Sequence, residues 1–346
     1  MTEYITIGRI EKSLKVSLQE STFSKIGVLV DENTRKYCLP IIEELLGSFV
    51  LIEIQSGELN KNINTCNSIW NSLTKNEFDR HSLIINLGGG VIGDMGGFCA
   101  ATFKRGITFI NIPTTLLAMV DASIGGKLGI DHGIYKNQIG LFQTPHHVFI
   151  DDQFLATLPK RELKSGFAEV IKHSLISKND DWELIKNTPF EQLKWEEIIR
   201  KSIAVKSTIV NSDFKEQGLR KVLNFGHTIG HAIESYFLEN STSPLLHGEA
   251  VAIGMICETY LSFKKSGISE NELNSIVKLI MHNYEKVEIK SDEFSGIIEL
   301  TAHDKKNARN KIQAVLLKSI GMPLIDSEIN SEEIGNALNY YNSLNI

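Results

Sequence analysis

The feature that most constrains the fold is an apolar strand that runs directly into a glycine-rich turn. Residues 82–87 read Ser-Leu-Ile-Ile-Asn-Leu, and residues 88–94 read Gly-Gly-Gly-Val-Ile-Gly-Asp. A short apolar run bounded by glycines is typical of a buried parallel strand. Glycines at its carboxyl end permit a tight turn and a close approach of backbone N–H groups to a phosphate. The pattern predicts a strand, a turn and a helix that could bind a nucleotide, although a purely structural turn would use the same glycines.

Similar segments place this strand in a larger sheet. Strands are expected at residues 25–31, 50–54, 82–87 and 107–112, with helices at 34–46 and 62–73 between them. Strands that alternate with helices predict a doubly wound parallel sheet, with ligands at the carboxyl ends of the strands.

From about residue 159 the pattern becomes mostly helical. Helices are expected at residues 161–177, 195–211, 222–237, 248–266 and 270–283, with one short strand at 312–317. We therefore predict a Rossmann-like α/β parallel-sheet domain over residues 1–155 and a mostly α-helical domain over residues 156–346. We expect the active site in the cleft between the two domains.

Composition narrows the class of protein. The chain has 346 residues, which favours about two domains, and a net charge of −6, which argues against a nucleic-acid binder. Its four cysteines lie far apart, as expected of a reduced cytoplasmic protein. We expect no secretion signal and no membrane-spanning segment, because no apolar run approaches about 20 residues.

Two histidines and a carboxylate share one face of a predicted helix. His227, His231 and Glu234 stand at positions i, i+4 and i+7, and His247 follows at the start of the next helix. This is how helices present metal ligands, although His227 and His231 could also be hydrogen-bonded histidines of the core. Spacing alone does not say which of the three binds a metal.

A second candidate lies on an earlier helix. Glu169, Lys172 and His173 share one face, and the residues between them are apolar. A buried Glu169 needs a partner, and a metal ion or an ion pair with Lys172 would serve equally.

Basic residues near glycines indicate an anionic ligand. Residues 121–127 read Asp-Ala-Ser-Ile-Gly-Gly-Lys, and Lys136 follows shortly after. Cations beside flexible glycine turns suit phosphate or carboxylate groups, although a surface loop explains the cluster as well.

Five segments together resemble 3-dehydroquinate synthase, a family of the sugar phosphate cyclases. They follow one another in family order over most of the chain: residues 87–107, 113–127, 162–173, 223–234 and 247–255. The resemblance implies a lyase of aromatic amino acid biosynthesis that binds NAD and one divalent metal ion, zinc or cobalt. It puts the metal on Glu169, His227 and His247, and makes His231 a substrate-facing residue. The implied nucleotide-binding residues are Asp31, Asn33, Glu58, Lys61, Gly89, Gly90, Val91, Asp94, Thr114, Thr115, Leu117, Lys127, Lys136, Phe154 and Thr157.

The same resemblance implies a seven-carbon keto-acid phosphate as substrate and a phosphate elimination between transient oxidation and reduction by NAD. Ring opening and an internal aldol reaction complete the conversion. A homodimer is implied as well, in which Arg105 reaches the site of the neighbouring subunit. The implied substrate-binding residues are Arg105, Asp121, Lys127, Asn137, Lys172, Lys206, Arg220, Asn224, His231 and Lys306.

The chain departs from the family pattern at two places. Residues 132–137 read His-Gly-Ile-Tyr-Lys-Asn where the family commonly has His-Pro-Leu-Gly-Lys-Asn, and Asn310 stands where it has glycine. The second departure leaves the choice between Lys305 and Lys306 open. Alternative functions are a cyclase that makes an inosose or a valiolone, a metal-dependent polyol dehydrogenase, and a non-catalytic binding protein.

Overall fold

The computed structural model describes residues 4–19, 22–133, 135–303 and 312–345. The chain divides into two compact units: Met1–Leu163 with Trp195–Ser207, and Lys164–Lys194 with Thr208–Ile346. The first unit thus includes a segment from beyond residue 155, and the predicted domain boundary there stays a prediction.

The first unit is built on a six-stranded sheet in which every neighbouring pair is parallel. In spatial order its strands are β1 (Ile5–Ile7), β8 (His147–Ile150), β5 (Thr108–Pro113), β4 (Leu83–Gly88), β2 (Ile26–Asp31) and β3 (Val50–Ile54). The chain moves outward from β2 to β3 and then crosses back past β2 to β4. The order of the strands therefore reverses between β2 and β4, and ligands of such sheets bind beyond the carboxyl ends at this point.

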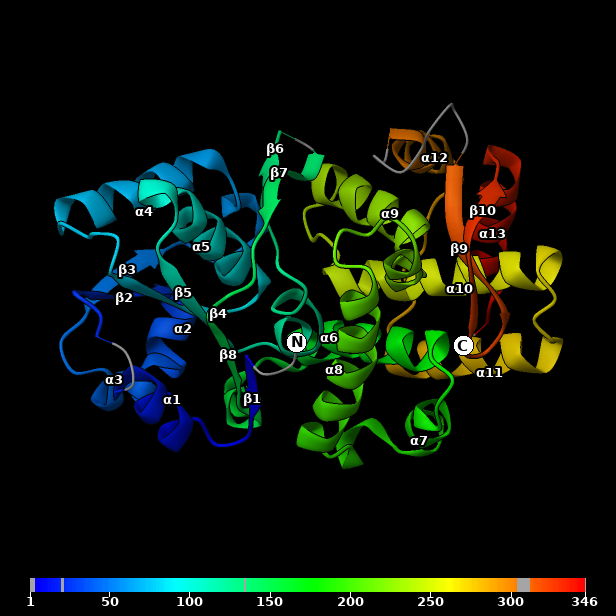
Figure 1. Cartoon of the computed structure of the whole chain (residues 1–346). Coiled ribbons are helices and arrows are strands. Elements are labelled where there is room, and N and C mark those ends of the chain that lie inside the picture. The colour runs from blue at the N-terminus through cyan, green and yellow to red at the C-terminus, as the bar shows by residue number, and fades with distance from the viewer. Residues whose placement is uncertain (1–3, 20–21, 134, 304–311, 346) are drawn as a thin grey trace. The chain divides into compact units, whose positions relative to one another are not determined.

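Helices cover both faces of this sheet. Figure 1 shows two of them, α4 (Ile63–Lys75) and α5 (Gly90–Thr102), on one face, and three others on the opposite face. Those three are α1 (Ile10–Gln19), α2 (Glu32–Tyr37) and α3 (Leu39–Leu46). Alternate strand residues explain the two layers, since buried Leu29 and Phe109 belong to the core beneath α4 and α5.

The single helix predicted over residues 34–46 was wrong, because the structure has two helices there. They are separated at Cys38, and Pro40 lies in the first turn of α3. Proline fits the first turn, where no intrahelical partner is lost, and not a helix interior.

An antiparallel hairpin of β6 (Lys127–His132) and β7 (Tyr135–Phe142) follows the π-helical turn Ala118–Ala122. It occupies the segment for which the sequence indicated only glycines and lysines. Its strands approach closely where Gly129 faces Gly140. Glycine is required there, since a Cβ atom on Gly140 would overlap the carbonyl oxygen of Leu128.

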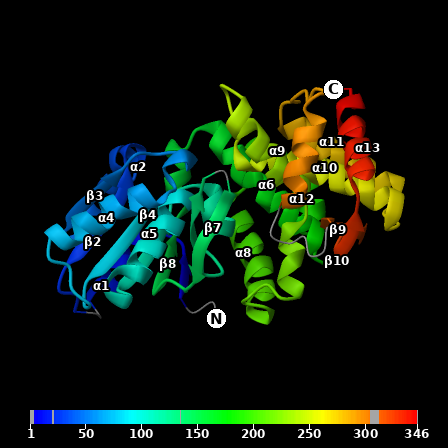
Figure 2. The ribbon, with the colours of Figure 1, turned by 90° about the horizontal axis from the view of Figure 1, so that it is seen from above.

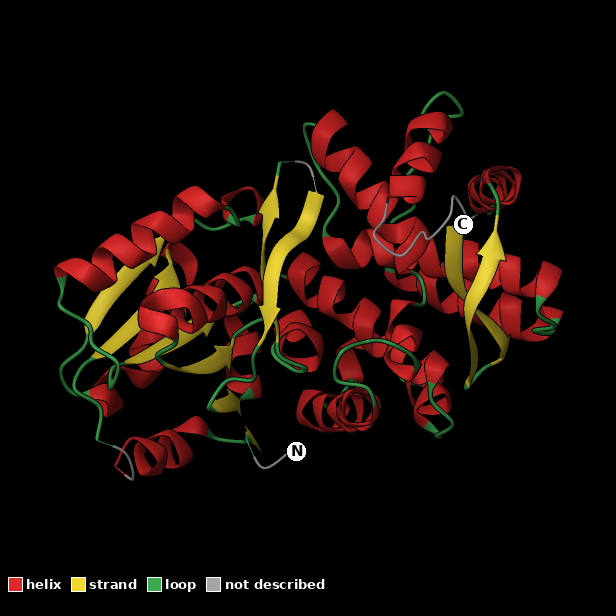
Figure 3. Ribbon diagram, turned by 45° about the horizontal axis from the view of Figure 1, so that its top comes forward, coloured by secondary structure: helices red, strands yellow, loops and turns green. Residues whose placement is uncertain are grey.

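Helices make up most of the described residues of the second unit, and Figure 3 shows an antiparallel hairpin of strands beside them. That hairpin consists of β9 (Ile312–Ser319), which the sequence predicts in part, and β10 (Met322–Ile329), which it does not. The helices are α6 (Lys160–Ile176, in this unit from Lys164), α7 (Asp181–Asn187), α8 (Trp195–Ser212, in this unit from Thr208), α9 (His227–Asn240), α10 (His247–Lys265), α11 (Glu270–Asn283), α12 (Phe294–His303) and α13 (Ser331–Ser343).

Helix α10 is the centre of the second unit. It packs against α9, α11, α13 and β9, and Figures 1 and 2 both show it beside α9. Small residues permit this packing, because a Cβ atom on Gly254 would overlap the carbonyl oxygen of Gly226. The α9 backbone can therefore approach α10 without intervening side chains.

The predicted helix 222–237 begins later than expected. Residues Leu219–Asn224 form a 3-10 helix, and α9 starts only at His227. Gly226 separates them with a left-handed φ of 79°, a conformation that glycine adopts at little cost.

The fold class is confirmed: a parallel sheet flanked by helices, followed by a mostly helical part. Among the described residues, no helix has both the length and the apolar character needed to cross a bilayer.

Candidate functional site

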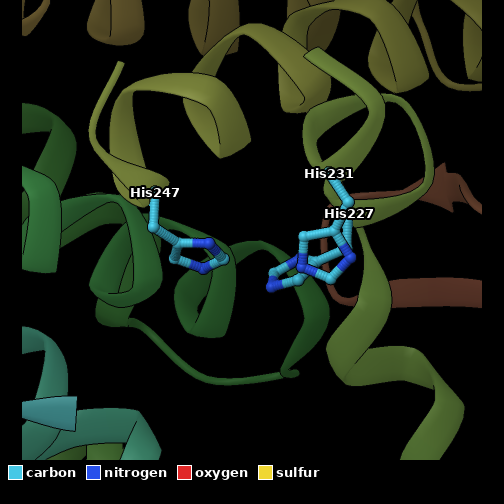
Figure 4. A group of neighbouring side chains, drawn as sticks. All are labelled: His227, His231 and His247. Carbon is cyan, nitrogen blue, oxygen red and sulfur yellow. The ribbon is translucent and has the colours of Figure 1, made fainter. Parts of the chain in front are cut away.

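Three histidines come together in the second unit. Figure 4 shows the rings of His227 and His231 on α9 and of His247 on α10 pointing toward one another. Their ring centroids lie 4.9 to 5.6 Å apart, and one nitrogen of each ring lies within 4.8 Å of the others. This set could hold a metal ion.

A buried carboxylate lies against two of these histidines. Oε1 of Glu169 is 3.4 Å from Nε2 of His227 and 3.7 Å from Nε2 of His247. The Glu169 side chain has no exposed surface. Two imidazoles and one carboxylate are a donor set that zinc and cobalt accept, and three ligands leave coordination positions open. The arrangement therefore fits a catalytic divalent metal ion.

The other ring nitrogens set which atoms face Glu169. Nδ1 of His227 lies 3.1 Å from the carbonyl oxygen of Phe225, and Nδ1 of His247 lies 3.0 Å from Oε2 of Glu234. Both partners accept a hydrogen bond, so both Nδ1 atoms donate, and a metal ion that displaces any proton on Nε2 can bind there. Nε2 of both rings therefore lies near the same Glu169 oxygen.

The two neighbouring carboxylates change the pKa of His247. Burial acts to lower the pKa of His247, but the carboxylates of Glu234 and Glu169 outweigh it and raise the pKa to about 10. The carboxylates thus favour a positive charge among them, which a proton or a metal cation can supply.

Close packing brings Glu169 to the histidines. The backbone N–H of Gly248 donates to Oγ of Ser165 at 3.0 Å, and a Cβ atom on Gly248 would overlap the Ser165 carbonyl oxygen. Glu169 lies one helical turn after Ser165 on α6, on the same face. Glycine next to His247 is therefore what lets α6 present its carboxylate.

Lys172 uses the other oxygen of the same carboxylate. Its Nζ contacts Oε2 of Glu169, and the Lys172 side chain is almost entirely buried. The sequence left a metal and an ion pair as alternative partners of Glu169. The structure gives the two oxygens separate surroundings, so the two partners are compatible.

Arg220 and Asn224 lie on the 3-10 helix before α9, and hydrogen bonds fix the loop that precedes this helix. The carboxylate of Asp213 accepts hydrogen bonds from the backbone N–H groups of Gln217, Gly218 and Arg220 at 2.7 to 3.0 Å. These bonds, that of the Gln217 amide foremost, lower the pKa of Asp213.

Sequence reasoning missed two carboxylates of this loop, Asp213 and Glu216. Nδ2 of Asn224 donates to Oε1 of Glu216 at 2.7 Å, and Glu216 has a left-handed φ of 58°. The spacing of Asp213 from Gly218 was the available signal, because an aspartate before a glycine turn commonly accepts its backbone N–H groups.

In the first unit, candidate nucleotide residues gather where the strand order reverses. Asp31 ends β2 and Gly89 precedes α5 next to β4. Asp31 also caps α2, accepting from the N–H groups of Asn33 and Thr34. An open cavity of about 620 Å³ lies nearby, at the carboxyl end of β3.

Lys61 is buried within this group. Its Nζ donates to Oδ2 of Asp94 at 2.6 Å and to Oδ1 of Asn137 at 2.7 Å. Burial alone would lower the pKa of Lys61, but Asp94 and Glu58 outweigh it and the pKa is raised. Lys136 lies 3.4 Å from Glu58, so the predicted lysines and acids are paired across the β6–β7 hairpin and the loop after β3.

The remaining predicted residues of this unit vary in exposure. Thr114 and Phe154 are buried, Gly90, Val91, Thr115 and Leu117 are half-buried, and Lys127, Thr157 and Arg105 are exposed. Lys206 on α8 donates to the backbone oxygen and to Oδ1 of Asp121, both at 2.6 Å. Lys305, Lys306 and Asn310 lie outside the described residues.

Known proteins resemble this chain over nearly its whole length. A family model described as 3-dehydroquinate synthase N-terminal matches residues 51–165, and one described as 3-dehydroquinate synthase C-terminal matches residues 166–307. The 3-dehydroquinate synthase of Parabacteroides distasonis is 42% identical over 340 residues, which cover 95% of this chain and 96% of that protein. That of Sulfurovum sp. is 39% identical over 328 residues, covering 93% of this chain and 92% of that protein.

Solved structures share the fold. A 2-deoxy-scyllo-inosose synthase complexed with carbaglucose-6-phosphate, NAD+ and Co2+ gives a TM-score of 0.84 at 24% identity, covering 97% of this chain and 96% of that one. A 2-epi-5-epi-valiolone synthase from Streptomyces hygroscopicus with NAD+ and Zn2+ bound gives 0.82 at 24% identity, covering 97% and 95%. A glycerol dehydrogenase from Schizosaccharomyces pombe gives 0.66 at 15% identity, covering 98% and 89%.

Proposed function

Because this chain belongs to the 3-dehydroquinate synthase family, we propose that it converts 3-deoxy-D-arabino-heptulosonate 7-phosphate to 3-dehydroquinate and phosphate. The observation that carries the proposal is the convergence of Oε1 of Glu169 with Nε2 of His227 and of His247. A buried carboxylate beside two imidazole Nε2 atoms is what a catalytic metal site requires and what a hydrophobic core avoids.

One divalent metal ion, zinc or cobalt, is held by Glu169, His227 and His247. When bound, the metal supplies Lewis acidity toward substrate hydroxyl groups, and NAD supplies a transient acceptor of two electrons that each turnover restores. His231 lies beside both metal-binding histidines and faces the substrate rather than the metal.

Cationic side chains of the second unit bind the anionic groups of the substrate. Lys172 and Arg220 are both buried, and Arg220 keeps its charge at any physiological pH. Asn224 is held by Glu216, which fixes the side-chain amide for a polar contact. A phosphate and a carboxylate are best bound by such fixed donors, because little reorganisation is needed when charge develops.

NAD binds to the first unit at the carboxyl ends of β2 and β4. Glycines at residues 88–90 leave room for the pyrophosphate near the first turn of α5. Asp31, Glu58 and Lys61 provide polar groups at neighbouring strand ends, and Lys61 is already charged and fixed by Asp94. The other nucleotide residues implied by the resemblance remain part of this proposal: Asn33, Asp94, Thr114, Thr115, Leu117, Lys127, Lys136, Phe154 and Thr157. Asp121, Asn137, Lys127 and Lys206 remain its substrate residues in this unit.

We further propose a cytoplasmic homodimer. All four cysteines are free and buried, as in a reducing compartment. Arg105 lies exposed in a turn where both Lys104 and Arg105 have left-handed φ values, 50° and 69°. A strained, exposed arginine of this kind suits a contact with a neighbouring subunit. Sedimentation of wild type and Arg105→Ala, with activity of each, tests this part.

The decisive experiment measures phosphate release from the proposed substrate with NAD, before and after treatment with EDTA. Release that EDTA stops and zinc or cobalt restores supports the proposal. No release by enzyme supplied with both NAD and metal would refute it. Release only from a hexose or heptulose phosphate without a carboxylate would favour an inosose or valiolone synthase. Accumulation of NADH in amounts equal to product would favour a polyol dehydrogenase.

A further inference from the structure

We propose that Glu258 on α10 is a positioning residue that fixes the backbone of His227 for metal binding. The inference rests on the metal site of the proposed function. Glu258 lies eleven positions after His247 in the sequence and is completely buried. Nothing in its spacing marked it as a site residue, and its carboxylate oxygens contact the backbone of residues 226 and 229.

Both carboxylate oxygens of Glu258 accept hydrogen bonds from the first turn of α9. Oε2 accepts from the backbone N–H of Gly226 at 2.6 Å, and Oε1 accepts from that of Ile229 at 3.1 Å. His227 lies between these two residues in the chain. Glu258 therefore holds the backbone on both sides of His227, and it satisfies two N–H groups that a helix N-terminus leaves without intrahelical partners.

A negative charge is well placed there. The N-terminus of a helix carries a partial positive charge, and a carboxylate that accepts two backbone N–H groups is stabilised by it. Burying a charge without partners would be costly, and the two backbone N–H groups offset part of that cost. The position of the carboxylate and that of the α9 terminus depend on each other.

The two helices hold each other's histidine. Glu234 on α9 accepts a hydrogen bond from Nδ1 of His247 on α10, and Glu258 on α10 accepts from the backbone around His227 on α9. The arrangement is reciprocal, with one carboxylate from each helix. It fixes one histidine through its ring and the other through its main chain.

Tight packing makes the Glu258 contact restrictive. A Cβ atom on Gly226 would lie 2.5 Å from Cγ of Met255, and one on Gly254 would overlap the Gly226 oxygen. The α9 terminus therefore has no alternative position further into α10. Metal ligands must be placed to within a few tenths of an ångström, so a shift of this terminus would move Nε2 of His227 away from the position that metal binding requires.

Replacing Glu258 by glutamine tests the assignment. Glutamine has the same size, but its amide group can accept only one of the two bonds and brings a donor against the other N–H. We expect the zinc affinity of Glu258→Gln, measured by competition with a chelating dye, to fall by about tenfold to a hundredfold. The visible absorption spectrum of the cobalt-loaded protein should change as well.

Glu272→Gln is the matched control. Each oxygen of Glu272 also accepts one backbone N–H, from Ser269 and from Ile320, both at 3.0 Å, in the same unit. This variant should lose stability without losing zinc affinity. Equal losses of affinity in both variants, or a Glu258→Gln affinity within twofold of wild type, would overturn the inference.

A measurement on wild type covers the case in which Glu258→Gln does not fold. Hydrogen exchange of the Gly226 and Ile229 amides should be slow in metal-free protein, because Glu258 and not the metal holds them. Slow exchange only after zinc is added would overturn the inference.

His247→Ala separates the two proposals. If it loses zinc and Glu258→Gln does not, the metal site stands and only the role of Glu258 fails. If wild type and His247→Ala bind zinc equally, or not at all, the proposed metal site fails and the role of Glu258 with it.

Discussion

Glu234 on α9 accepts a hydrogen bond from Nδ1 of His247 on α10 at 3.0 Å. The bond orients the imidazole ring so that Nε2 faces Glu169, 3.7 Å away. Spacing along α9 had offered Glu234 as a third ligand beside His227 and His231. In the structure it acts on a histidine of another helix, and a carboxylate behind a metal-binding histidine raises the basicity of that ligand.

Glu234→Gln should weaken metal binding without removing it. The amide oxygen can still accept from Nδ1, so the ring keeps its orientation, but the negative charge behind the imidazole is lost. We expect about a tenfold lower zinc affinity, measured by competition with a chelator. An affinity equal to that of wild type would show that the charge of Glu234 has no effect on the ligand.

His247→Ala and His231→Ala should differ in metal content. Loss of His247 removes a proposed ligand, so the folded variant should retain little zinc after dialysis and show no turnover. Loss of His231 removes a substrate-facing ring, so turnover should fall while bound zinc stays near one per chain. Elemental analysis and circular dichroism together check both. Zinc lost from His231→Ala and kept by His247→Ala would reverse the assignment.

Lys61→Met should destabilise the first unit and weaken NAD binding. The change leaves Asp94 without the cation that lies 2.6 Å from it, in a place where burial already raises the pKa of the Asp94 carboxyl. Breaking such a pair costs about 3 kcal/mol of unfolding free energy, measured in urea. The double variant Lys61→Met, Asp94→Leu should recover part of that stability but not the NAD affinity.

Gly254→Ala should be poorly tolerated, unlike the same change at Gly335. A methyl group at residue 254 would overlap the Gly226 oxygen, whereas at residue 335 the nearest atom, of Ile298, lies 4.0 Å away. We expect Gly254→Ala to lose at least about 2 kcal/mol of unfolding free energy. Gly335→Ala, within α13, should gain up to about 1 kcal/mol. Similar stabilities of the two variants would contradict the close packing of α9 on α10.

Asp213→Asn should lower stability most at neutral pH. Backbone N–H groups lower the pKa of Asp213 from its ordinary 3.8 in the folded state. A group with a depressed folded pKa contributes stability above its unfolded pKa and loses it as pH falls through the folded pKa. The melting temperatures of wild type and variant should therefore converge below about pH 4. A gap that stays constant with pH would rule out this contribution.

Much of the fold was predictable because its signals are local in sequence. The apolar runs before Asp31 and Gly88 indicate buried parallel strands, and their alternation with helices indicates the doubly wound sheet. The β6–β7 hairpin was missed because Gly129 and Gly140 interrupt the apolar pattern. Their purpose is visible only in the pairing, where the two backbones come close.

The site was predictable in part for the same reason. His227 and His231 are recognisable by their helical spacing. The oxygen of Glu169 near His227 comes from α6, and the spacing of residues along α9 gives no information about a side chain on another helix. Glu258 carries no sequence signal, since its partners are backbone N–H groups, and every residue type except proline has one.

Both histidines of the proposed metal site and both carboxylates that hold them lie within residues 226–258. Only Glu169 comes from elsewhere in the chain. Contacts between residues near in sequence close short loops, which costs little entropy and favours early formation during folding. We therefore expect the α9–α10 hairpin to take shape first, with its two imidazoles already facing each other. The docking of α6 then completes the donor set, which makes metal capture a late event in folding.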